Sequence, residues 1–212
     1  IMTDIHRLLE KIFNKIKTQI SQKPFLSRII ASFDFYYALS KNIDRSSFLF
    51  EIYDKLVYSK FREIFGSRLN KLVSGGAPLS KEIAQFFVNI GVPIYQGYGL
   101  TEFSPVISTN YPAENKIGSC GKVIPSARIK IAENKELLVK GPSLMKGYLN
   151  QEKLTKTTID ENGWLHTGDA AYLDEDGYLY ITSRVKEIFK TSTGEYVNAI
   201  SIEQKLAKNR YI

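Results

Sequence analysis

The first third of the chain repeats its apolar residues with the period of an α-helix. Between residues 5 and 20 they recur at three- and four-residue steps, with Arg and Lys on the other faces. This pattern predicts an amphipathic helix docked on a core. A second helix, rich in aromatic residues, is expected over residues 24–39. A third is expected over residues 47–65, where Gly66 ends it.

A strand–helix–strand unit is predicted in the middle of the chain. Residues 69–73 have the pattern of a short buried strand that leads into the Gly75-Gly76 turn. Ser80 is the expected cap of a helix that runs to Asn89, and residues 92–95 begin another strand. Elements in this order and at this spacing indicate a βαβ unit and therefore a parallel sheet.

Beyond Pro112 the pattern changes to short strands separated by turns. One helix, over residues 151–157, interrupts them. The expected strands are residues 127–132, 136–140, 171–173 and 178–182, with turns at Asn134-Lys135 and Glu175-Asp176-Gly177. From Lys186 a further unit is predicted, with a strand, a Thr193-Gly194 turn and a helix over residues 199–208.

These elements predict an α/β fold with three parts. Residues 1–115 form a helical and parallel α/β portion, and residues 116–185 form a mostly antiparallel, β-rich subdomain. Residues 186–212 form a hinge and the start of a C-terminal domain.

Composition excludes several classes of protein. A hydrophobic fraction of 43% with 24% charged residues is that of a globular chain and not of a disordered one. No apolar run approaches the roughly 20 residues that span a bilayer, and residues 1–20 lack the continuous apolar core of a signal peptide. The single cysteine, Cys120, excludes an internal disulfide. We therefore expect a cytoplasmic protein.

The net charge of +7 favours anionic partners such as nucleotides, coenzyme A or acidic lipid headgroups. The sequence has no zinc-finger spacing, no RNA-recognition motif and no long Lys/Arg run, so we expect no nucleic-acid partner. For residues 5–20 a second interpretation is a basic helix that rests on a membrane. That interpretation predicts a peripheral contact with the inner membrane surface.

Two glycine-rich segments follow the predicted strands of the βαβ unit. The first runs from Ser74 to Ser80 and places paired glycines between a strand and a helix. The second, Gln96-Gly97-Tyr98-Gly99-Leu100-Thr101-Glu102, offers an aromatic face, a hydroxyl and a carboxylate. Exposed backbone and polar groups at this edge of a parallel sheet suit a nucleotide. The competing interpretations are an ordinary strand-to-helix turn and a surface hairpin.

Three more segments follow in a fixed order. They are Lys140-Gly141-Pro142-Ser143-Leu144-Met145-Lys146-Gly147-Tyr148, Gly163-Trp164-Leu165-His166-Thr167-Gly168-Asp169 and the stretch from Asp176 to Glu187. With the two segments above, they closely resemble the adenylate-forming superfamily of acyl-CoA synthetases, luciferases and peptide-synthetase adenylation domains. The resemblance covers roughly residues 69–197. Residues 52–80, with 188–190 and 194–197, look like bacterial-type long-chain fatty acyl-CoA synthetases.

The resemblance implies a nucleotide site. Tyr98 would stack on the adenine, and Asp169 would accept hydrogen bonds from both ribose hydroxyls, a role that suits an acceptor-only carboxylate. Arg184 would contact the ribose or phosphate. The backbone positions implied around the adenine and acyl group are Gly75, Gly76, Ala77, Gln96, Gly97 and Gly99.

The resemblance also implies catalytic roles. Thr101 would hydrogen-bond the α-phosphate, and Glu102 would help to hold Mg²⁺. Lys186 would be the hinge about which a C-terminal domain rotates. Gly194 would lie on the loop that approaches coenzyme A. The implied ligands are ATP, Mg²⁺, coenzyme A and a fatty acid, which is first joined to AMP and then transferred to the thiol of coenzyme A.

Two family elements do not occur in these 212 residues: the Ser/Thr/Gly-rich phosphate loop and the C-terminal catalytic lysine. The chain therefore resembles an internal part of such an enzyme, and we expect it to be inactive alone. Smaller departures at Ser183, Thr193 and Ala199 put the geometry of the coenzyme A loop in doubt.

Other interpretations stay open. An adenylating enzyme with another acceptor, such as a carrier protein or oxygen, is the nearest, followed by a non-catalytic nucleotide-binding module and a membrane-associated interaction domain. His166 is expected to have a packing or hydrogen-bonding role, Cys120 to pack and Trp164 to lie in the core.

Overall fold

The computed structural model describes residues 5–22, 24–40, 43, 47–63, 65–66, 69, 71–77, 79–190, 196–198 and 206. The chain divides into two compact units. Unit 1 contains residues 1–97 and 110–118, and unit 2 contains residues 98–109 and 119–212. The strand β2 (Ile94–Gly99) belongs to both units, because the boundary falls within it. The fold class is α/β, as predicted.

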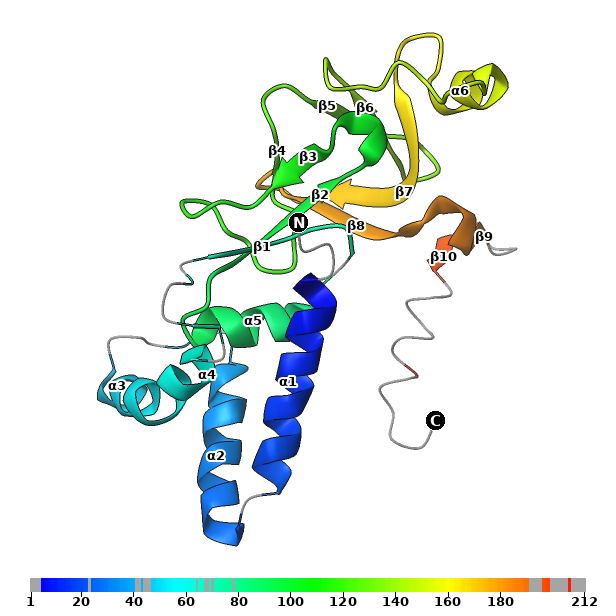
Figure 1. The fold of residues 1–212 in the computed structure, drawn as a ribbon. Helices are drawn as coiled ribbons and strands as arrows, with labels where there is room; N and C mark the ends of the chain where they lie inside the picture. Colours follow the sequence, from blue (N-terminus) through cyan, green and yellow to red (C-terminus); the bar gives the residue numbers. More distant parts are fainter. Residues whose placement is uncertain are drawn as a thin grey trace. The chain divides into compact units, whose positions relative to one another are not determined.

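Helices build most of unit 1. The helices α1 (Ile5–Ser21) and α2 (Phe25–Ala38) lie side by side and both contact α5 (Lys81–Asn89) (Figure 1). The apolar stripe of α1 is buried in a core that includes aromatic rings from α2 and α5. Phe13, Phe35 and Phe86 contact one another there, with ring centroids 5.1–5.2 Å apart. This packing confirms that α1 is a helix docked on a core.

The third predicted helix contains a wider turn. It consists of α3 (Phe48–Tyr53), a π-helical turn η1 (Asp54–Tyr58) and α4 (Ser59–Glu63). The Arg62 guanidinium donates to both carboxylate oxygens of Asp54, at 2.5 and 2.9 Å, and to the carbonyl of Ile90 at 2.7 Å. Because Ile90 follows α5, Arg62 ties this helix to the core helix of unit 1.

The βαβ unit has the predicted parallel geometry. The strand β1 (Leu72–Ser74) pairs in parallel with β2, in a register that places Ser74 opposite Gln96. Ser80 occupies the N-cap position of α5, but its side chain makes no capping hydrogen bond, which corrects the prediction. β2 also extends to Gly99, so Gln96, Gly97 and Tyr98 lie within a strand and not after one.

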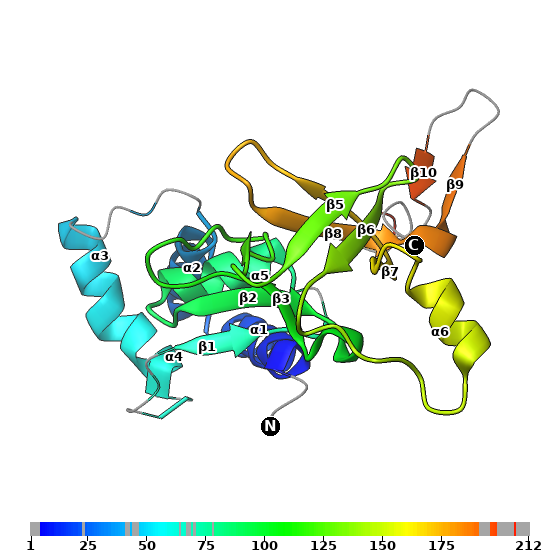
Figure 2. The same cartoon turned by 90° about the horizontal axis from the view of Figure 1, so that it is seen from above.

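Unit 2 is built around an antiparallel sheet with strand order β5-β6-β7-β8. Figure 2 shows these strands from above. The strands are β5 (Arg128–Ile131), β6 (Glu136–Lys140), β7 (Leu165–Leu173) and β8 (Leu179–Arg184). Both predicted turns are present, since β5–β6 and β7–β8 are antiparallel pairs. β7 starts six residues earlier than predicted, so that Leu165 to Ala170 are strand residues.

The remaining elements of unit 2 are short. A 3-10 turn η2 (Thr101–Phe103) precedes the strand β3 (Val106–Thr109), which was not predicted and which pairs with β4 (Lys122–Val123). The helix α6 (Glu152–Thr158) is close to its predicted bounds. A 3-10 turn η3 (Val185–Glu187) leads to the hairpin of β9 (Ile188–Lys190) and β10 (Tyr196–Asn198). The helix predicted over residues 199–208 lies outside the described residues, except for residue 206.

Among the described residues, no helix is both long enough and apolar enough to cross a membrane. The division of the chain into residues 1–115, 116–185 and 186–212 stays a prediction.

Candidate functional site

The first glycine-rich turn packs against the second glycine-rich segment. In unit 1, Ser74 is the register partner of Gln96. Gly75, which follows Ser74, lies beside Gly97, which follows Gln96. A methyl group added at Gly75 would lie 3.5 Å from the Gly97 carbonyl oxygen, which is an ordinary contact distance. Gly76 and Ala77 follow directly in this turn. The fold thus brings the two backbone segments together.

Ser74 is an exceptional residue in this turn. Its side chain is 1% exposed, and its hydroxyl has no hydrogen-bond partner among the described residues. A buried hydroxyl without a partner is uncommon, because the lost interaction with water is not replaced. The carbonyl of Gln96, by contrast, accepts hydrogen bonds from the backbone and side-chain nitrogens of Asn110, at 2.8 and 3.0 Å. These bonds fix the strand immediately before Tyr98.

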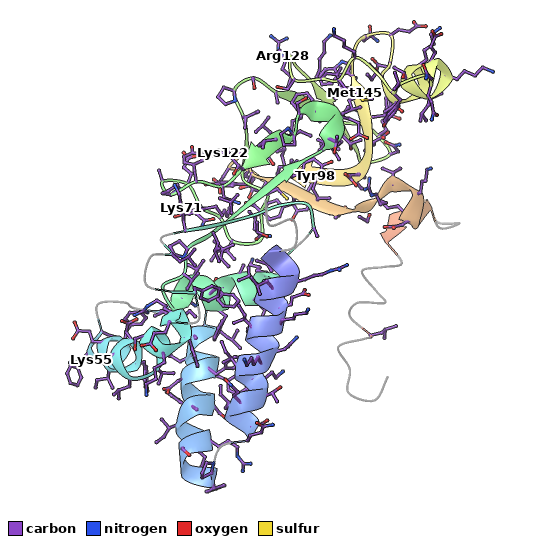
Figure 3. The ribbon with its side chains drawn as sticks, viewed as in Figure 1. Lys55, Lys71, Tyr98, Lys122, Arg128 and Met145 are labelled. Atoms are coloured by element: carbon purple, nitrogen blue, oxygen red, sulfur yellow. The ribbon has the colours of Figure 1, made fainter. Side chains whose placement is uncertain are left out.

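Three side chains predicted from distant parts of the sequence meet in unit 2. The Tyr98 hydroxyl donates to Oδ2 of Asp169 at 2.5 Å, and the Arg184 guanidinium lies 3.0 Å from Oδ1 of the same carboxylate. Asp169 is 8% exposed at its side chain, whereas Arg184 is 58% exposed. Burial, and then the bond to Asp169, raises the pKa of Tyr98 well above its usual range, so the phenol stays a neutral donor. Figure 3 labels Tyr98 on β2.

β6 holds the segment that presents Asp169. The Thr167 hydroxyl donates to the Leu137 carbonyl at 2.7 Å and accepts from the Asp169 backbone N–H at 3.1 Å. The Glu136 carboxylate accepts from the Gly168 backbone N–H at 3.0 Å, and its other oxygen lies 3.1 Å from Nδ1 of His166. Gly168 has a φ of +70°, a conformation that favours glycine. The position of Asp169 is therefore fixed by β6 through an irregular register.

Glu102 is held by a loop that is distant from it in the sequence. The Tyr148 hydroxyl donates to Oε1 of Glu102 at 2.9 Å, and the Met145 backbone N–H donates to the Glu102 carbonyl at 2.8 Å. Burial, and then the bond to Glu102, raises the pKa of Tyr148. Figure 3 labels Met145 on this loop. Thr101, in the same 3-10 turn as Glu102, is exposed and open to a ligand.

A close backbone approach fixes the turn that carries Thr101 and Glu102. A methyl group added at Gly99 would lie 1.7 Å from the Pro105 carbonyl oxygen, so no side chain fits there. That oxygen also accepts from the Leu100 backbone N–H at 2.8 Å. The second glycine of the predicted nucleotide segment is therefore required by the chain's own fold.

Glu102 is the candidate carboxylate for a magnesium ion that binds together with a nucleotide. No group of three or more metal-ligating side chains exists among the described residues. Mg²⁺ bound with ATP needs only one or two carboxylates, because phosphates and waters fill the other positions. Glu102 is a single, partly buried carboxylate with one oxygen bonded to Tyr148. It fits as the one protein carboxylate of such a site.

The last two predicted positions lie near the end of the described chain. Lys186 is exposed in η3, where the Arg184 backbone N–H donates to the Glu187 carboxylate at 3.1 Å. Gly194 lies outside the described residues.

Sequence reasoning missed Tyr148, Glu136 and Thr167 as supporting residues. Tyr148 is the last residue of a segment that the sequence analysis singled out, but nothing in its spacing pointed to Glu102.

Roles for three other residues were also predicted from the sequence. His166 has the expected hydrogen-bonding role, and Cys120 packs against the core of unit 2, where burial raises its thiol pKa. Trp164 is not in the core: it is partly exposed, and the Lys130 ammonium lies 4.9 Å from its ring centroid.

The chain is similar to known proteins over most of its length. Residues 13–149 match the family model described as "AMP-binding enzyme". The long-chain-fatty-acid–CoA ligase ACSBG1 of Macaca fascicularis is 36% identical over 211 residues, which are 94% of this chain and 29% of that protein. The putative fatty-acid–CoA ligase fadD11 of Mycobacterium tuberculosis is 42% identical over 154 residues, 72% of this chain and 27% of its own length. The chain thus spans less than a third of these relatives.

Solved structures of a coenzyme A synthetase are also similar to this chain. Unliganded O-succinylbenzoate coenzyme A synthetase from Bacillus subtilis aligns with a TM-score of 0.59 at 33% identity, covering 66% of this chain and 33% of that enzyme. The same enzyme in complex with ATP and a magnesium ion aligns with a TM-score of 0.57 at 32% identity, covering 69% and 34%. Since the family model matches more than half of its residues, the chain belongs to the AMP-binding enzyme family.

Proposed function

We propose that the protein from which this chain comes joins a long-chain fatty acid to AMP and then transfers the acyl group to coenzyme A. The observation that carries the proposal is the buried Asp169 carboxylate, with the Tyr98 hydroxyl and the Arg184 guanidinium on its two oxygens. The names of the long-chain-fatty-acid–CoA ligases that it resembles support the substrate class.

Asp169 keeps acceptor capacity for a ribose. Each carboxylate oxygen has two lone-pair sites, and the structure uses about one on each oxygen. The two hydroxyls of a ribose can donate to the remaining sites. The Tyr98 ring, fixed by its own hydroxyl, offers an aromatic face to the adenine. Arg184 is permanently charged and exposed, so its guanidinium can donate to a ligand phosphate or ribose while it stays beside Asp169.

The first half-reaction brings two anions together. An oxygen of the fatty-acid carboxylate attacks the α-phosphorus of ATP, the bond to the bridging oxygen breaks, and pyrophosphate leaves with the electron pair. Bound Mg²⁺ supplies positive charge that offsets the charge of the phosphates. The Thr101 hydroxyl would donate to an α-phosphate oxygen, and Glu102, which accepts from the Tyr148 hydroxyl, would help to hold the metal. No protein nucleophile is needed.

The second half-reaction uses the thiol of coenzyme A. Its sulfur attacks the acyl carbonyl carbon, the carbon–oxygen bond to the phosphate breaks, AMP leaves, and the thiol proton passes to solvent. Lys186 would be the hinge between the two half-reactions, and Gly194 would approach the coenzyme. A carrier protein as acceptor would leave the first half-reaction unchanged, so the acceptor must be tested separately.

Fatty-acid-dependent ATP–pyrophosphate exchange by the full gene product tests the proposal. Acids from acetate to long-chain fatty acids should show exchange that rises with chain length, and coenzyme A should then give acyl-CoA. A folded protein that binds ATP but exchanges pyrophosphate with none of the acids would overturn the proposal. The purified 212-residue chain should show no exchange, because its sequence contains neither the phosphate loop nor the catalytic lysine that the family resemblance implies.

A further inference from the structure

The helix α2 carries apolar side chains on two faces. One face, with Ala31, Phe35 and Ala38, is at most 7% exposed and packs in the core of unit 1. The other face bears large apolar side chains that are 51–67% exposed, at steps of three and four residues: Phe25, Ile29, Phe33 and Tyr36. Ile30, at the edge of this face, is 63% exposed. Single exposed apolar residues are normal, but a continuous stripe marks an interaction surface.

This stripe differs from the helix face that the sequence indicated for a membrane contact. Five apolar residues of α1 are buried, from Leu9 at 0% exposed to Ile12 at 9%, and Leu8 at 39% is its one exposed large apolar side chain among the described residues, so these residues leave no apolar stripe on α1 for a bilayer. Its neighbour α2 has one. Phe33 contacts the ring of Tyr53 at 6.2 Å between centroids, yet it stays 60% exposed.

A groove of about 200 Å³ lies beside the stripe, between α1 and α2. Its walls carry the cations Lys17 and Arg28 and the hydroxyls of Ser21 and Ser32, and apolar atoms of Ile20, Phe35 and Tyr36 line the rest. Among the described residues, neither Lys17 nor Arg28 forms an ion pair with a carboxylate. The Arg28 guanidinium lies over the Phe25 ring, 5.8 Å from its centroid, and the Ser21 hydroxyl donates to the Thr18 carbonyl at 2.7 Å. Two cations without a carboxylate partner can donate to the oxygens of a phosphate group.

The charge of the whole hairpin agrees with an anionic partner. Residues 5–38 contain six Lys or Arg residues and two Asp or Glu residues, which gives a net charge of +4. One of the two acidic residues, Asp34, is 1% exposed and contributes little to the surface. An apolar face flanked by basic residues, on a helix that cannot span a bilayer, is typical of interfacial binding to anionic lipid.

We propose that α2 is the membrane-contact helix of this protein. Phe25, Ile29, Phe33 and Tyr36 enter the interface of an anionic bilayer, while Lys17 and Arg28 bind the phosphate of a lipid headgroup in the groove. The proposal is independent of the reaction proposed above, since it uses none of the residues assigned to the nucleotide.

Co-sedimentation with vesicles tests the proposal, on the full gene product and on the 212-residue chain. Both should bind vesicles that contain about one third phosphatidylglycerol in phosphatidylcholine at least ~10-fold more tightly than phosphatidylcholine alone, and salt should weaken the difference. The double variant Lys17→Gln/Arg28→Gln should lose that preference. The double variant Ile29→Ser/Phe33→Ser should bind both kinds of vesicle about 10-fold more weakly, because less apolar surface enters the interface.

Matched controls lie in unit 2. Leu149 is 89% exposed, and Lys153 is exposed on α6, so Leu149→Ser and Lys153→Gln change the same chemistry elsewhere and should leave binding unchanged. The α2 variants alter only exposed side chains, and circular dichroism checks that they fold. Absence of binding to anionic vesicles, or equal binding by the α2 variants and wild type, overturns the proposal. Binding by the 212-residue chain but not by the full gene product also overturns it, because another part of the same polypeptide then covers the face. A dimer that binds no lipid and that Phe33→Ser abolishes overturns it too, because the face then binds a second copy.

Discussion

At the scale of single residues, hydrogen bonds from neighbouring groups fix the conformation of the charged side chain of Glu102. Glu102 is placed by the Tyr148 hydroxyl at 2.9 Å and by the Met145 backbone at 2.8 Å, both from a loop more than 40 positions away in the sequence. A carboxylate on a short turn has several rotamers of similar energy. The bond from Tyr148 selects one of them, so Tyr148 is a positioning residue for Glu102.

Tyr148→Phe should therefore weaken the magnesium-dependent part of ATP binding about 10-fold, since a hydrogen bond to a charged group is worth ~1.5–3 kcal/mol. AMP binding without Mg²⁺ should not change. Titration of ATP affinity against Mg²⁺ measures both quantities. Tyr172→Phe, at a tyrosine 48% exposed on β7, is the matched control. Equal losses for AMP and for Mg-ATP would show that Tyr148 acts only on stability.

Tyr58 makes the stability of unit 1 depend on pH in the alkaline range. Its side chain is 0% exposed, and its hydroxyl donates to the Asp34 carbonyl at 3.0 Å. Burial, and then the charge of Asp34, raises the pKa of Tyr58 above its ordinary value. The unfolded chain therefore releases this proton near pH ~10 while the folded chain keeps it. The stabilisation is complete below pH ~10 and is lost as the pH rises toward the folded value.

Tyr58→Phe should lower the free energy of unfolding by ~1 kcal/mol at neutral pH, through the lost hydrogen bond. Above pH ~10 the variant should lose stability less steeply than wild type, because one titrating group is gone. Urea unfolding from neutral pH to pH ~11 measures this difference. Tyr36→Phe, at a tyrosine 67% exposed, should keep the wild-type slope. Equal slopes for wild type and Tyr58→Phe would contradict the assignment.

The sequence predicted the residues proposed to contact the nucleotide better than the residues that hold them in place. Tyr98, Asp169 and Arg184 were taken from family resemblance, and the fold brings all three together. Glu136 was not singled out, although it holds Gly168 at 3.0 Å. Its role depends on an irregular register between β6 and β7, which no local pattern in either strand encodes.

At the scale of elements, periodicity succeeded where one face is buried. The stripe of α1 predicted a helix within a few residues of its bounds. β2 and β7 were predicted too short, because glycine and polar residues interrupt their apolar runs at Gly97 and at Thr167-Gly168. Strand propensity is weak at such positions, and pairing with neighbouring strands overrides it. The π-helical turn at Asp54–Tyr58 leaves no sequence signal, since its helix keeps the same apolar pattern.

The end of β2 depends on one glycine. Gly99→Ala would place a methyl carbon 1.7 Å from the Pro105 carbonyl oxygen, and only a movement of backbone can relieve this overlap. We expect a loss of about 3 kcal/mol or more in the free energy of unfolding. Gly75→Ala is the matched control, because its nearest atom would be at an ordinary contact distance of 3.5 Å. Its effect should stay within ~1 kcal/mol. Equal urea midpoints for the two variants would show that the turn adapts.

At the scale of the whole molecule, the chain has two cores of different kinds. The core of unit 1 contains a cluster of aromatic rings, in which Phe86 and Phe87 are 0% exposed. Branched aliphatic residues dominate the core of unit 2, with Leu137, Val139 and Leu165 at 0–1% exposed. Tyr98, Asp169 and Arg184 belong to unit 2. A substitution in the core of unit 1 should therefore leave the stabilisation by a ligand bound to these residues unchanged.

Thermal unfolding with and without AMP can separate the two effects. At 100 times its dissociation constant, AMP should add ~2.7 kcal/mol and raise the melting temperature by roughly 5–10 °C. Ile90→Val, in the core of unit 1, should lower the free energy of unfolding by ~0.5–1.5 kcal/mol and keep the rise with AMP. Asp169→Asn should also destabilise the ligand-free protein, because the buried carboxylate accepts from Tyr98, and it should abolish the rise with AMP. A full rise with AMP in Asp169→Asn would remove Asp169 from the nucleotide site, while a rise lost in Ile90→Val would mean that the first core shapes that site.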